Sequence, residues 1–415
     1  MKIAIVGSGI AGLTCAYLLN RQHDIQVFEA SDWIGGHTHT VDVLVDGRSY
    51  AIDTGFIVFN DWTYPNFIRL LEQIGVGFKP TEMSFSVSDP ATSVEYNGHD
   101  LNTLFAQRSN LLSPAFWGML RDILRFNRQS LDDLANNRIS ADTTLGQYLD
   151  SNGYGRRFIE HYIVPMGSAI WSMSLADMLG FPLQFFVRFC KNHGLLSVSD
   201  RPQWQVIEGG SRSYVAPLTA SFAERIRLNC PVSRVVRDQD GVTLHSAAGA
   251  ERFDKVIFAC HSDQALALLE QPSEQERDIL GALPYANNDV VLHTDTRLLP
   301  KRKLAWASWN YRLGGPSDQP AAVTYDMNIL QGIDSDTTFC VSLNQTAAID
   351  PSKILARFQY AHPQYSLAGT AAQARWEELL GAQHSYYCGA YWANGFHEDG
   401  VVSALRVARA FGETL

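Results

Sequence analysis

Near its N-terminus the chain carries the stretch KIAIVGSGIAGL, residues 2–13. An apolar run typical of a buried strand precedes the glycines, and a helical pattern follows them as far as Asn20. A second apolar run, residues 25–28, ends at Glu29. Strand, Gly-rich turn, helix and strand in this order are typical of a βαβ unit that binds a dinucleotide. The stretch therefore predicts a doubly wound α/β domain.

The residues of this turn have separate expected roles. Gly7 permits the tight turn, Gly9 lets the backbone approach a pyrophosphate, and Gly12 lets the helix pack closely on the strand. The helix begins near Ile10 and Ala11, where its N-terminus would hold the phosphate charge. These five residues are the first candidates for cofactor binding.

Glu29 lies about 20 residues into the motif, where an acidic side chain accepts hydrogen bonds from an adenosine ribose. A carboxylate at this place disfavours a 2′-phosphate, so NADP is not the expected ligand. Six and seven positions later the chain has Gly35 and Gly36. A glycine pair lets the backbone come close to phosphate or ribityl oxygens.

The segment FEASDWIGGHT, residues 28–38, resembles part of the FAD-binding motif in the superfamily of flavin amine oxidases, carotenoid desaturases and protoporphyrinogen oxidases. It is similar in particular to a bacterial branch described only as predicted FAD/NAD-binding oxidoreductases. The resemblance implies FAD rather than NAD as the ligand. His37 stands where this superfamily usually has Arg, and an imidazole still donates to a phosphate. The segment adds as cofactor-binding candidates Ala30, Gly35, Gly36, His37 and Thr38.

Further stretches resemble other motifs of the superfamily. Residues 53–55 (DTG) resemble the segment that approaches the flavin end of the cofactor, and residues 208–211 (EGGS) resemble the return into the FAD domain. Residues 395–404 (GFHEDGVVSA) resemble the last motif, whose helix points its N-terminus at the flavin pyrimidine ring. A helix N-terminus there stabilises negative charge that develops on reduction. These stretches imply as further cofactor-binding candidates Asp53, Thr54, Gly55, Val232, Gly389, Glu398, Asp399 and Val401.

Two departures from the family pattern concern how the cofactor is held. Many relatives have an acid that binds the ribityl chain where this chain has Ala390, so Asp53 or Asp399 is the candidate substitute. Some relatives attach their flavin covalently in the stretch between Cys340 and Cys388, which contains no cysteine here. The resemblance therefore implies FAD that is bound without a covalent link.

Two more departures concern the reacting end of the cofactor. Amine oxidases commonly place a Lys on a strand of the substrate domain, and the corresponding residues, 287–294, include none. His397 stands where amine oxidases have one wall of an aromatic cage. An imidazole there is a candidate catalytic acid or base near neutral pH, and a structural role is the alternative.

Aromatic residues near these motifs are candidates for lining a substrate channel. Residues 304–311 have the alternation of a strand that places Trp309 and Tyr311 on one face. Tyr391 and Trp392 follow the glycine of the ribityl segment. For each of the four, packing in the core is the alternative to contact with an apolar substrate.

Composition limits the partners of the chain. Its 415 residues suffice for two domains, and its net charge of −10 without a Lys/Arg-rich run argues against nucleic acid. No apolar stretch is long enough for a transmembrane helix, and peripheral contact with a membrane stays open. Six cysteines without a CxxC pair argue against a metal site and suit a reducing compartment, so we expect a cytoplasmic protein.

Periodicity predicts a block of helices in the middle of the chain. The expected helices there are residues 114–134, 145–152, 156–171 and 183–193. A further helix is expected at 214–225, and a last one from about residue 400 to 411.

The expected fold class is α/β: a Rossmann-like FAD-binding domain with an interleaved α+β substrate domain of mixed sheet plus helical block. We assign residues 1–85, 204–270 and 385–415 to the first domain, and residues 86–203 and 271–384 to the second. The resemblance implies an FAD-dependent oxidoreductase, of oxidase or desaturase type, that removes a hydride equivalent from carbon. The apolar faces of the helical block and the aromatic strand favour a hydrophobic, lipid-like small molecule as the substrate. The alternatives are a flavin-containing amine oxidase and a non-redox FAD-dependent isomerase or structural flavoprotein.

Overall fold

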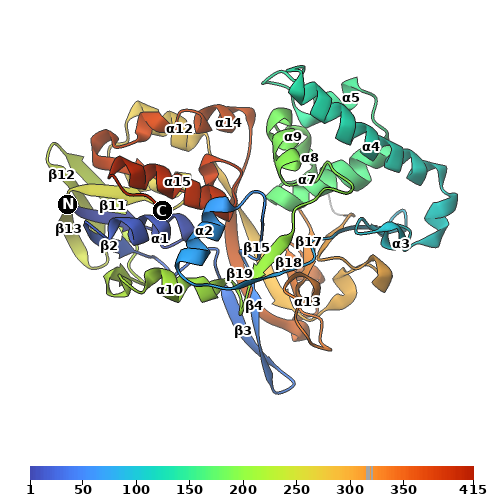
Figure 1. The fold of residues 1–415 in the computed structure, drawn as a ribbon, viewed down its shortest axis with the longest axis horizontal. Coiled ribbons are helices and arrows are strands. Elements are labelled where there is room, and N and C mark those ends of the chain that lie inside the picture. Colours follow the sequence, from blue (N-terminus) through green and yellow to red (C-terminus); the bar gives the residue numbers. More distant parts are fainter. Residues whose placement is uncertain (315–317, 319–320) are drawn as a thin grey trace.

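The structure is a computed structural model that describes residues 1–314, 318 and 321–415. One half is built on a parallel sheet in which β1 lies between β2 and β14, as a βαβ unit requires. Figure 1 shows this half on the left, with both chain termini. In spatial order the sheet comprises β10 (Ile226–Arg227), β2 (Asp24–Phe28), β1 (Lys2–Val6), β14 (Lys255–Phe258) and β20 (Ser385–Tyr387).

Side chains of β1 point alternately to the two faces of the parallel sheet, and both sets are apolar. Each face is therefore covered by its own hydrophobic core. Ile3 and Ile5 pack with helices α1 (Ile10–Leu19) and α15 (His397–Ala410). Ala4 and Val6 pack on the other face with an antiparallel sheet. That second sheet comprises β11 (Val232–Asp238), β12 (Gly241–Ser246) and β13 (Gly249–Phe253).

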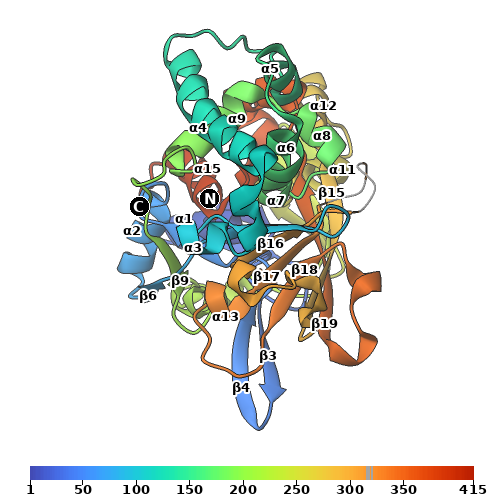
Figure 2. The same cartoon turned by 90° about the vertical axis from the view of Figure 1, so that its right-hand side faces the viewer.

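The other half contains a seven-stranded mixed sheet and the helical block. The helical block is on the right of Figure 1 and at the top of Figure 2, and the mixed sheet lies below it in both views. Their side chains share one large hydrophobic core. All neighbouring strands of this sheet are antiparallel except β16 and β7. In spatial order it comprises β19 (Ile354–Pro363), β15 (Tyr285–His293), β18 (Cys340–Leu343), β17 (Val323–Asp326), β16 (Trp309–Arg312), β7 (Phe85–Asp89) and β8 (Val94–Asn97).

Smaller elements connect the two halves. Two minor sheets are β3 (Thr40–Val45) with β4 (Arg48–Asp53), and β5 (Val58–Asn60) with β9 (Trp204–Ile207) and β6 (Phe78–Pro80). The remaining principal helices are α2 (Pro65–Gln73), α3 (Leu101–Leu104), α8 (Leu175–Leu179), α11 (Ser262–Leu268), α12 (Glu274–Gly281), α13 (Met327–Leu330) and α14 (Leu367–Gln373).

Three of the four expected helices of the block are present: α4 (Pro114–Ala135), α5 (Leu145–Ser151) and α9 (Leu183–Asn192). The fourth is interrupted, because a π-helical turn at Ile159–Ile163 separates α6 (Arg156–Phe158) from α7 (Val164–Trp171). Pro165 has no N–H to donate to the carbonyl of His161. The Tyr96 hydroxyl donates to that carbonyl instead, at 2.6 Å.

Other local predictions were wrong. The helix expected at 214–225 is α10 (Val215–Thr219) between two 3₁₀ turns. After α10 the Phe222 amide donates to the Thr219 carbonyl, three residues back, at 2.9 Å, so the chain turns more tightly than an α-helix. The strand expected at 304–311 includes only β16, because the Asn310 amide bonds both the N–H and the carbonyl of Ala307 and closes a turn. The last helix begins at His397, three residues before the expected start.

The predicted α/β class with a Rossmann-like domain and a second domain of mixed sheet plus helices is confirmed. The five strands of the parallel sheet all fall within residues 1–85, 204–270 and 385–415. The exact boundaries stay a prediction. Within the part of the chain that the structure describes, no helix combines the length and the apolar character needed to cross a membrane.

Candidate cofactor and substrate site

A cavity of about 900 Å³ lies where the parallel sheet meets β15 and β19. This volume is near the upper end of the roughly 300–1,000 Å³ found for ligand pockets. The first βα turn and the carboxyl ends of β2 and β14 contribute to its wall. Ligands of open α/β sheets bind outside the carboxyl ends of the strands, so the cavity lies where the fold predicts a ligand.

The Gly-rich turn forms one end of the cavity. Gly7, Gly9, Ile10 and Ala11 line it, and no atom lies within 4 Å of the place where a Cβ on Gly9 would be, so backbone is open to a ligand there. Gly12 is not on the wall: a Cβ on it would lie 2.1 Å from the carbonyl oxygen of Gly7. Its role is the close helix–strand packing that the motif predicts.

Glu29 lines the same end and is almost fully buried. One carboxylate oxygen accepts from the Ser8 amide and hydroxyl at 2.9 and 2.6 Å, and the other accepts from the Ser31 amide and hydroxyl at the same distances. Burial acts to raise the pKa of Glu29, but the hydrogen bonds from Ser31 and Ser8 outweigh it and lower the pKa. The carboxylate therefore stays ionised.

The glycine pair leads into a group of three histidines on the cavity wall. Gly35, Gly36 and His37 line the cavity, and the His37 ring centroid lies 6.2 Å from that of His261 and 5.5 Å from that of His362. Burial and the neighbouring histidines lower the pKa values of His37 and His261 to about 4 and that of His362 to about 3. All three imidazoles are therefore neutral at pH 7.

His397 and the 54–58 segment meet at the far end. Thr54, Gly55 and Phe56 line the cavity, and the Phe56 ring stacks on the His397 imidazole with centroids 3.4 Å apart. His397 Nε2 lies 3.0 Å from Thr38 Oγ1 and 3.1 Å from the Tyr214 hydroxyl. Burial, with a smaller contribution from His37, lowers the pKa of His397 well below 6.5. The ring is thus a neutral, hydrogen-bonded member of an aromatic cluster, which is unlike an acid or base that titrates near neutral pH.

Several predicted cofactor-binding residues lie outside the cavity wall. The Asp53 carboxylate accepts from Thr40, Ser211 and Gln331, so it is not free for a ribityl chain. Asp399 accepts from the amides of Asn394 and Phe396 and caps α15. Neither acid lines the cavity, whereas Gly389 and Ala390 do.

Three more of these residues serve packing. The Glu398 carboxylate accepts from the amides of Asn66 and Phe67 and caps α2. Val401 is buried in the core between α1 and α15, and Thr38 reaches the site only through its hydrogen bond to His397. The sequence could not distinguish Thr38 and Glu398 from ligands because they flank His37 and His397, which do line the cavity. Val232 and Ala30 are on the wall.

Two of the four aromatic candidates line the cavity, Trp309 and Tyr391. Tyr311 is buried in the core of the second domain, and the Trp392 indole donates to the carbonyl of Tyr387, 3.2 Å away, on the far side of the wall.

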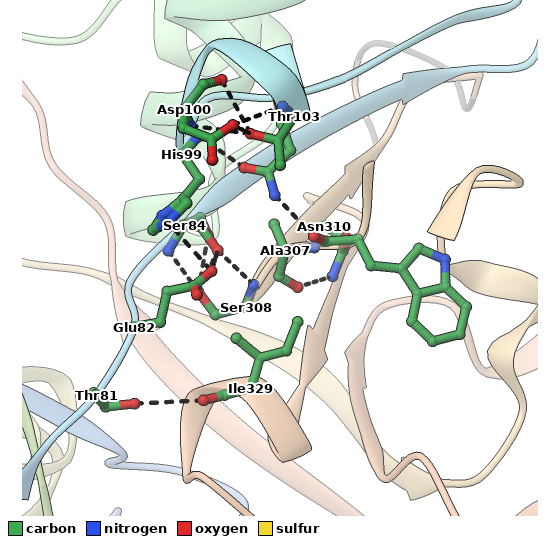
Figure 3. A network of polar contacts seen from close by, with 12 residues as sticks. Thr81, Glu82, Ser84, His99, Asp100, Thr103, Ala307, Ser308, Asn310 and Ile329 are labelled. Carbon is green, nitrogen blue, oxygen red and sulfur yellow. Dashed lines mark hydrogen bonds and ion pairs between the residues drawn. The ribbon is translucent and has the colours of Figure 1, made fainter. Parts of the chain in front are cut away.

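A polar network fixes the loop before Trp309 (Figure 3). Ser84 and Ser308 exchange hydrogen bonds of 2.6 and 3.0 Å, and Asn310 closes the turn at Ala307. These bonds set the direction in which β16 presents Trp309.

Sequence reasoning missed the strand that contributes most to the far wall. Tyr360 and His362 of β19 line the cavity, and Phe358, Tyr360 and His362 alternate along one face. That period of two was visible in the sequence but was not assigned to a strand. Other lining residues without a motif are Ile170, Trp171, Tyr285, Val290, Tyr325 and Tyr365.

The wall carries almost no charge. Among the described residues that line it, Glu29 is the single carboxylate, and no Lys or Arg is present. Within the same residues, some buried polar atoms have no hydrogen-bond partner, and such atoms usually mark a place for a ligand or water. They are His37 Nε2, Trp309 Nε1, the Tyr365 hydroxyl and the Tyr391 hydroxyl.

Known proteins with similar sequences include a flavin-containing oxidase and carotenoid desaturases by name. The model of the family described as flavin containing amine oxidoreductase matches residues 10–328. "Putative flavin-containing monoamine oxidase AofH" of Mycobacterium tuberculosis is 24% identical over 350 residues, which are 79% of this chain and 71% of that protein. Zeta-carotene desaturase of Solanum lycopersicum is 38% identical over 76 residues, 18% of this chain and 12% of that protein.

The fold matches solved structures along nearly the whole chain. A structure titled as a "Putative protoporphyrinogen oxidase" from Exiguobacterium sp. 255-15 has a TM-score of 0.68 at 18% identity and covers 99% of this chain and 98% of its own. At this identity the likeness shows the fold. The predicted superfamily is thereby confirmed. The chain belongs to the family of flavin containing amine oxidoreductases and is a flavin-dependent oxidoreductase.

Proposed function

We propose that the cofactor is FAD, bound without a covalent link, with its adenosine at Glu29 and its flavin beside α15. Open backbone at Gly9 and the four unpartnered polar atoms support a large ligand that bonds to both backbone and side chains. His37 Nε2 is one of those atoms and would donate to the pyrophosphate. A ribose diol would replace the Ser8 and Ser31 hydroxyls on the Glu29 carboxylate. When bound, the flavin supplies a hydride acceptor.

The substrate in this proposal is an apolar, lipid-like molecule that gives up a hydride equivalent from carbon. One observation carries this: apart from Glu29, no charged side chain of the described residues faces the cavity. A cationic amine would lose its hydration there without gaining a partner, which costs several kcal/mol. Side chains such as Ile170, Trp171, Trp309 and Phe396 offer an apolar wall instead.

The residues of the chain would orient the substrate and exclude water rather than exchange its protons. The N-terminus of α15 lies at the cavity, where Gly395, Phe396 and His397 line the wall, and its backbone dipole favours negative charge. His397, held by Thr38 and Tyr214 and stacked on Phe56, fixes this helix end. We therefore assign His397 a positioning role.

A flavin amine oxidase is the second candidate, because the similarity to AofH extends over most of the chain. Among residues 287–294, Asn287 and Val290 line the cavity. This strand therefore brings no Lys to the cavity, unlike the strand of amine oxidases that commonly carries one. A neutral amine would be compatible with a wall that has one carboxylate and no Lys or Arg among the described residues.

We include a cytoplasmic location in the proposal, since all six cysteines are free thiols.

Anaerobic reduction of the purified protein tests the proposal. Denaturation should first release FAD, and not FMN, into solution. An unsaturated or long-chain acyl lipid should then bleach the visible flavin absorbance, whereas hydrophobic and cationic amines should not. Bleaching by amines alone would replace the lipid substrate with an amine. A flavin that no substrate reduces, in a protein that converts an unsaturated lipid into an isomer, would show the non-redox alternative.

A further inference from the structure

Residues 101–128 expose an unusual number of large apolar side chains. Leu112 is 89% exposed, Leu101 76%, Leu124 58% and Trp117 50%. They lie on α3, on the 3₁₀ turn Arg108–Leu112 and on the first turns of α4, with Leu111 among them. We call these five residues and the arginines around them the α3–α4 surface. A contiguous apolar patch on a folded protein usually marks a contact surface.

The pieces of this surface are held together rigidly. The Trp117 indole donates to the carbonyl of Leu111 at 2.9 Å, and its ring lies 5.4 Å from that of Phe105. Asp100 and Thr103 form a reciprocal cap at the start of α3, as Figure 3 shows. Figure 1 places α3 and the start of α4 at the right-hand edge of the molecule, away from the parallel sheet, and Figure 2 shows them on the side that faces the viewer.

The charge of the segment is opposite to that of the chain. Residues 101–128 contain four arginines, at 108, 121, 125 and 128, and one carboxylate, Asp122, in a chain of net charge −10. Asp122 is buried and accepts from the Gly155 amide at 2.9 Å, and it pairs with Arg121 and Arg125 at 3.7 and 3.6 Å. Four arginines against one carboxylate still give the segment a positive net charge. The acids that flank the segment are Asp100, whose carboxylate caps α3, and Asp132 and Asp133, which pair with Arg138.

Apolar and basic side chains alternate along one face of α4. Trp117, Arg121, Leu124 and Arg128 follow each other at spacings of four, three and four residues, which places them in one stripe. All four are exposed. The stripe continues from the turn that carries Leu112. A helix with Trp and Leu next to Arg is typical of one that lies in the interface of a bilayer.

We propose that the α3–α4 surface docks the protein on a lipid bilayer that contains anionic lipids. Leu112 and Trp117 would enter the region between headgroups and acyl chains, and the arginines would contact anionic headgroups. Contact between two copies through the same face is disfavoured, because it would place these arginines opposite each other. Docking needs neither a cofactor nor a substrate, so it is independent of the function proposed above.

Flotation with vesicles tests the apolar part. The protein with its flavin should float with vesicles of phosphatidylcholine and phosphatidylglycerol and much less with phosphatidylcholine alone. Leu112→Ser and Trp117→Ser should each weaken binding about tenfold, given the transfer free energy of such side chains. The control is Leu44→Ser, at a side chain that is 75% exposed on β3, which should bind as the wild type does. Equal loss in the control, or none in the other two, would overturn the proposal.

Charge and oligomeric state complete the test. Arg121→Gln and Arg128→Gln should each weaken binding to the anionic vesicles about fivefold, and added salt should abolish the difference. Arg357→Gln, an exposed arginine of β19, is the matched control. Thermal melting and flavin content of each variant report that it is folded. A wild type that binds no vesicles, or that is a dimer which Leu112→Ser dissociates, would show that the surface serves another partner.

Discussion

The two ends of the cavity are built in different ways. The dinucleotide end takes its turn, its helix end and its carboxylate from two short stretches near the N-terminus, within residues 7–11 and 29–36. The reacting end takes Phe56 from one segment, Trp171 from α7, Trp309 from β16, Tyr360 from β19 and His397 from α15. The first end presents mainly backbone and one anion, and the second presents mainly uncharged side chains.

This difference explains why one end follows the superfamily and the other departs from it. A pyrophosphate needs open backbone next to a helix end, and glycine alone satisfies the contacts at such positions. An apolar substrate needs only volume and shape, which many combinations of side chains provide. Changes at the dinucleotide end should therefore abolish cofactor binding, and changes at the reacting end should have graded effects.

The largest effect is expected from Gly12→Ala. The added Cβ would lie 2.1 Å from the carbonyl oxygen of Gly7, so α1 or the turn must move, at a cost of about 3 kcal/mol or more in the free energy of unfolding. Gly118→Ala is the matched control, because Gly118 is also helical and nothing lies within 4 Å of its Cβ position. It should be neutral or stabilise by up to about 1 kcal/mol. Urea unfolding and flavin content measure both, and a stable, yellow Gly12→Ala protein would contradict the packing role.

His397→Ala should lose about 2–3 kcal/mol of unfolding free energy, because it leaves a void under Phe56 and removes the bonds to Thr38 and Tyr214. His397→Gln keeps a polar group near Nε2 and should lose less. Since the folded-state pKa lies below the unfolded value of 6.5, the wild type should lose stability as the pH falls below 6.5, and both variants should lessen this slope.

A positioning role for His397 also has a kinetic signature. The rate of flavin reduction in the wild type should not change with the protonation of this ring between about pH 6 and 8, because the imidazole is already neutral there. If the rate of flavin reduction changes with pH in this range in the wild type but not in His397→Gln, His397 is instead an acid or base.

Glu29→Gln should weaken FAD binding by about 2 kcal/mol, since a charged acceptor becomes a neutral one. The variant also changes the pH dependence of stability without cofactor. The pKa of Glu29 is lowered from 4.5 in the folded state, so the ionised carboxylate stabilises above pH 4.5 and the benefit disappears as the pH falls through the folded-state pKa. Wild type and variant should therefore converge in acid. Isothermal titration with FAD and pH-dependent unfolding provide the measurements, and unchanged affinity would remove Glu29 from the ribose site.

The smallest effect is expected from Tyr365→Phe at the reacting end. The buried Tyr365 hydroxyl has no partner among the described residues, so its removal should raise the stability of the ligand-free protein by up to about 1 kcal/mol. Tyr360→Phe is the matched control, since its hydroxyl bonds to Thr54 and His39 at 2.8 Å each and its loss should cost about 1 kcal/mol. Destabilisation in both variants would mean that Tyr365 has a bonded hydroxyl in the cavity.

The comparison also shows which predictions were within reach of the sequence. Helices α4, α5 and α9 follow from local periodicity, and the turn at Gly7 follows from a motif whose parts are adjacent. Asp53, Asp399 and Glu398 were assigned to the cofactor because they stand in stretches that resemble motifs of the superfamily, yet their carboxylates cap helices or bond to buried hydroxyls. Whether each of these carboxylates points toward the cavity or away from it depends on hydrogen-bond partners that are more than 100 residues away or on the cap of a helix. A short motif does not encode such partners.

By itself, the sequence determined the α/β class, the dinucleotide turn, the acid at Glu29 and the family to which the chain belongs. These features depend on hydrophobic period and on backbone geometry, which are properties of short stretches. Only the tertiary structure decided that His397 is a neutral ring stacked on Phe56, that β19 forms a wall of the cavity, and that the wall carries a single carboxylate. Burial and side-chain contacts set these properties, and both arise only when distant segments pack together.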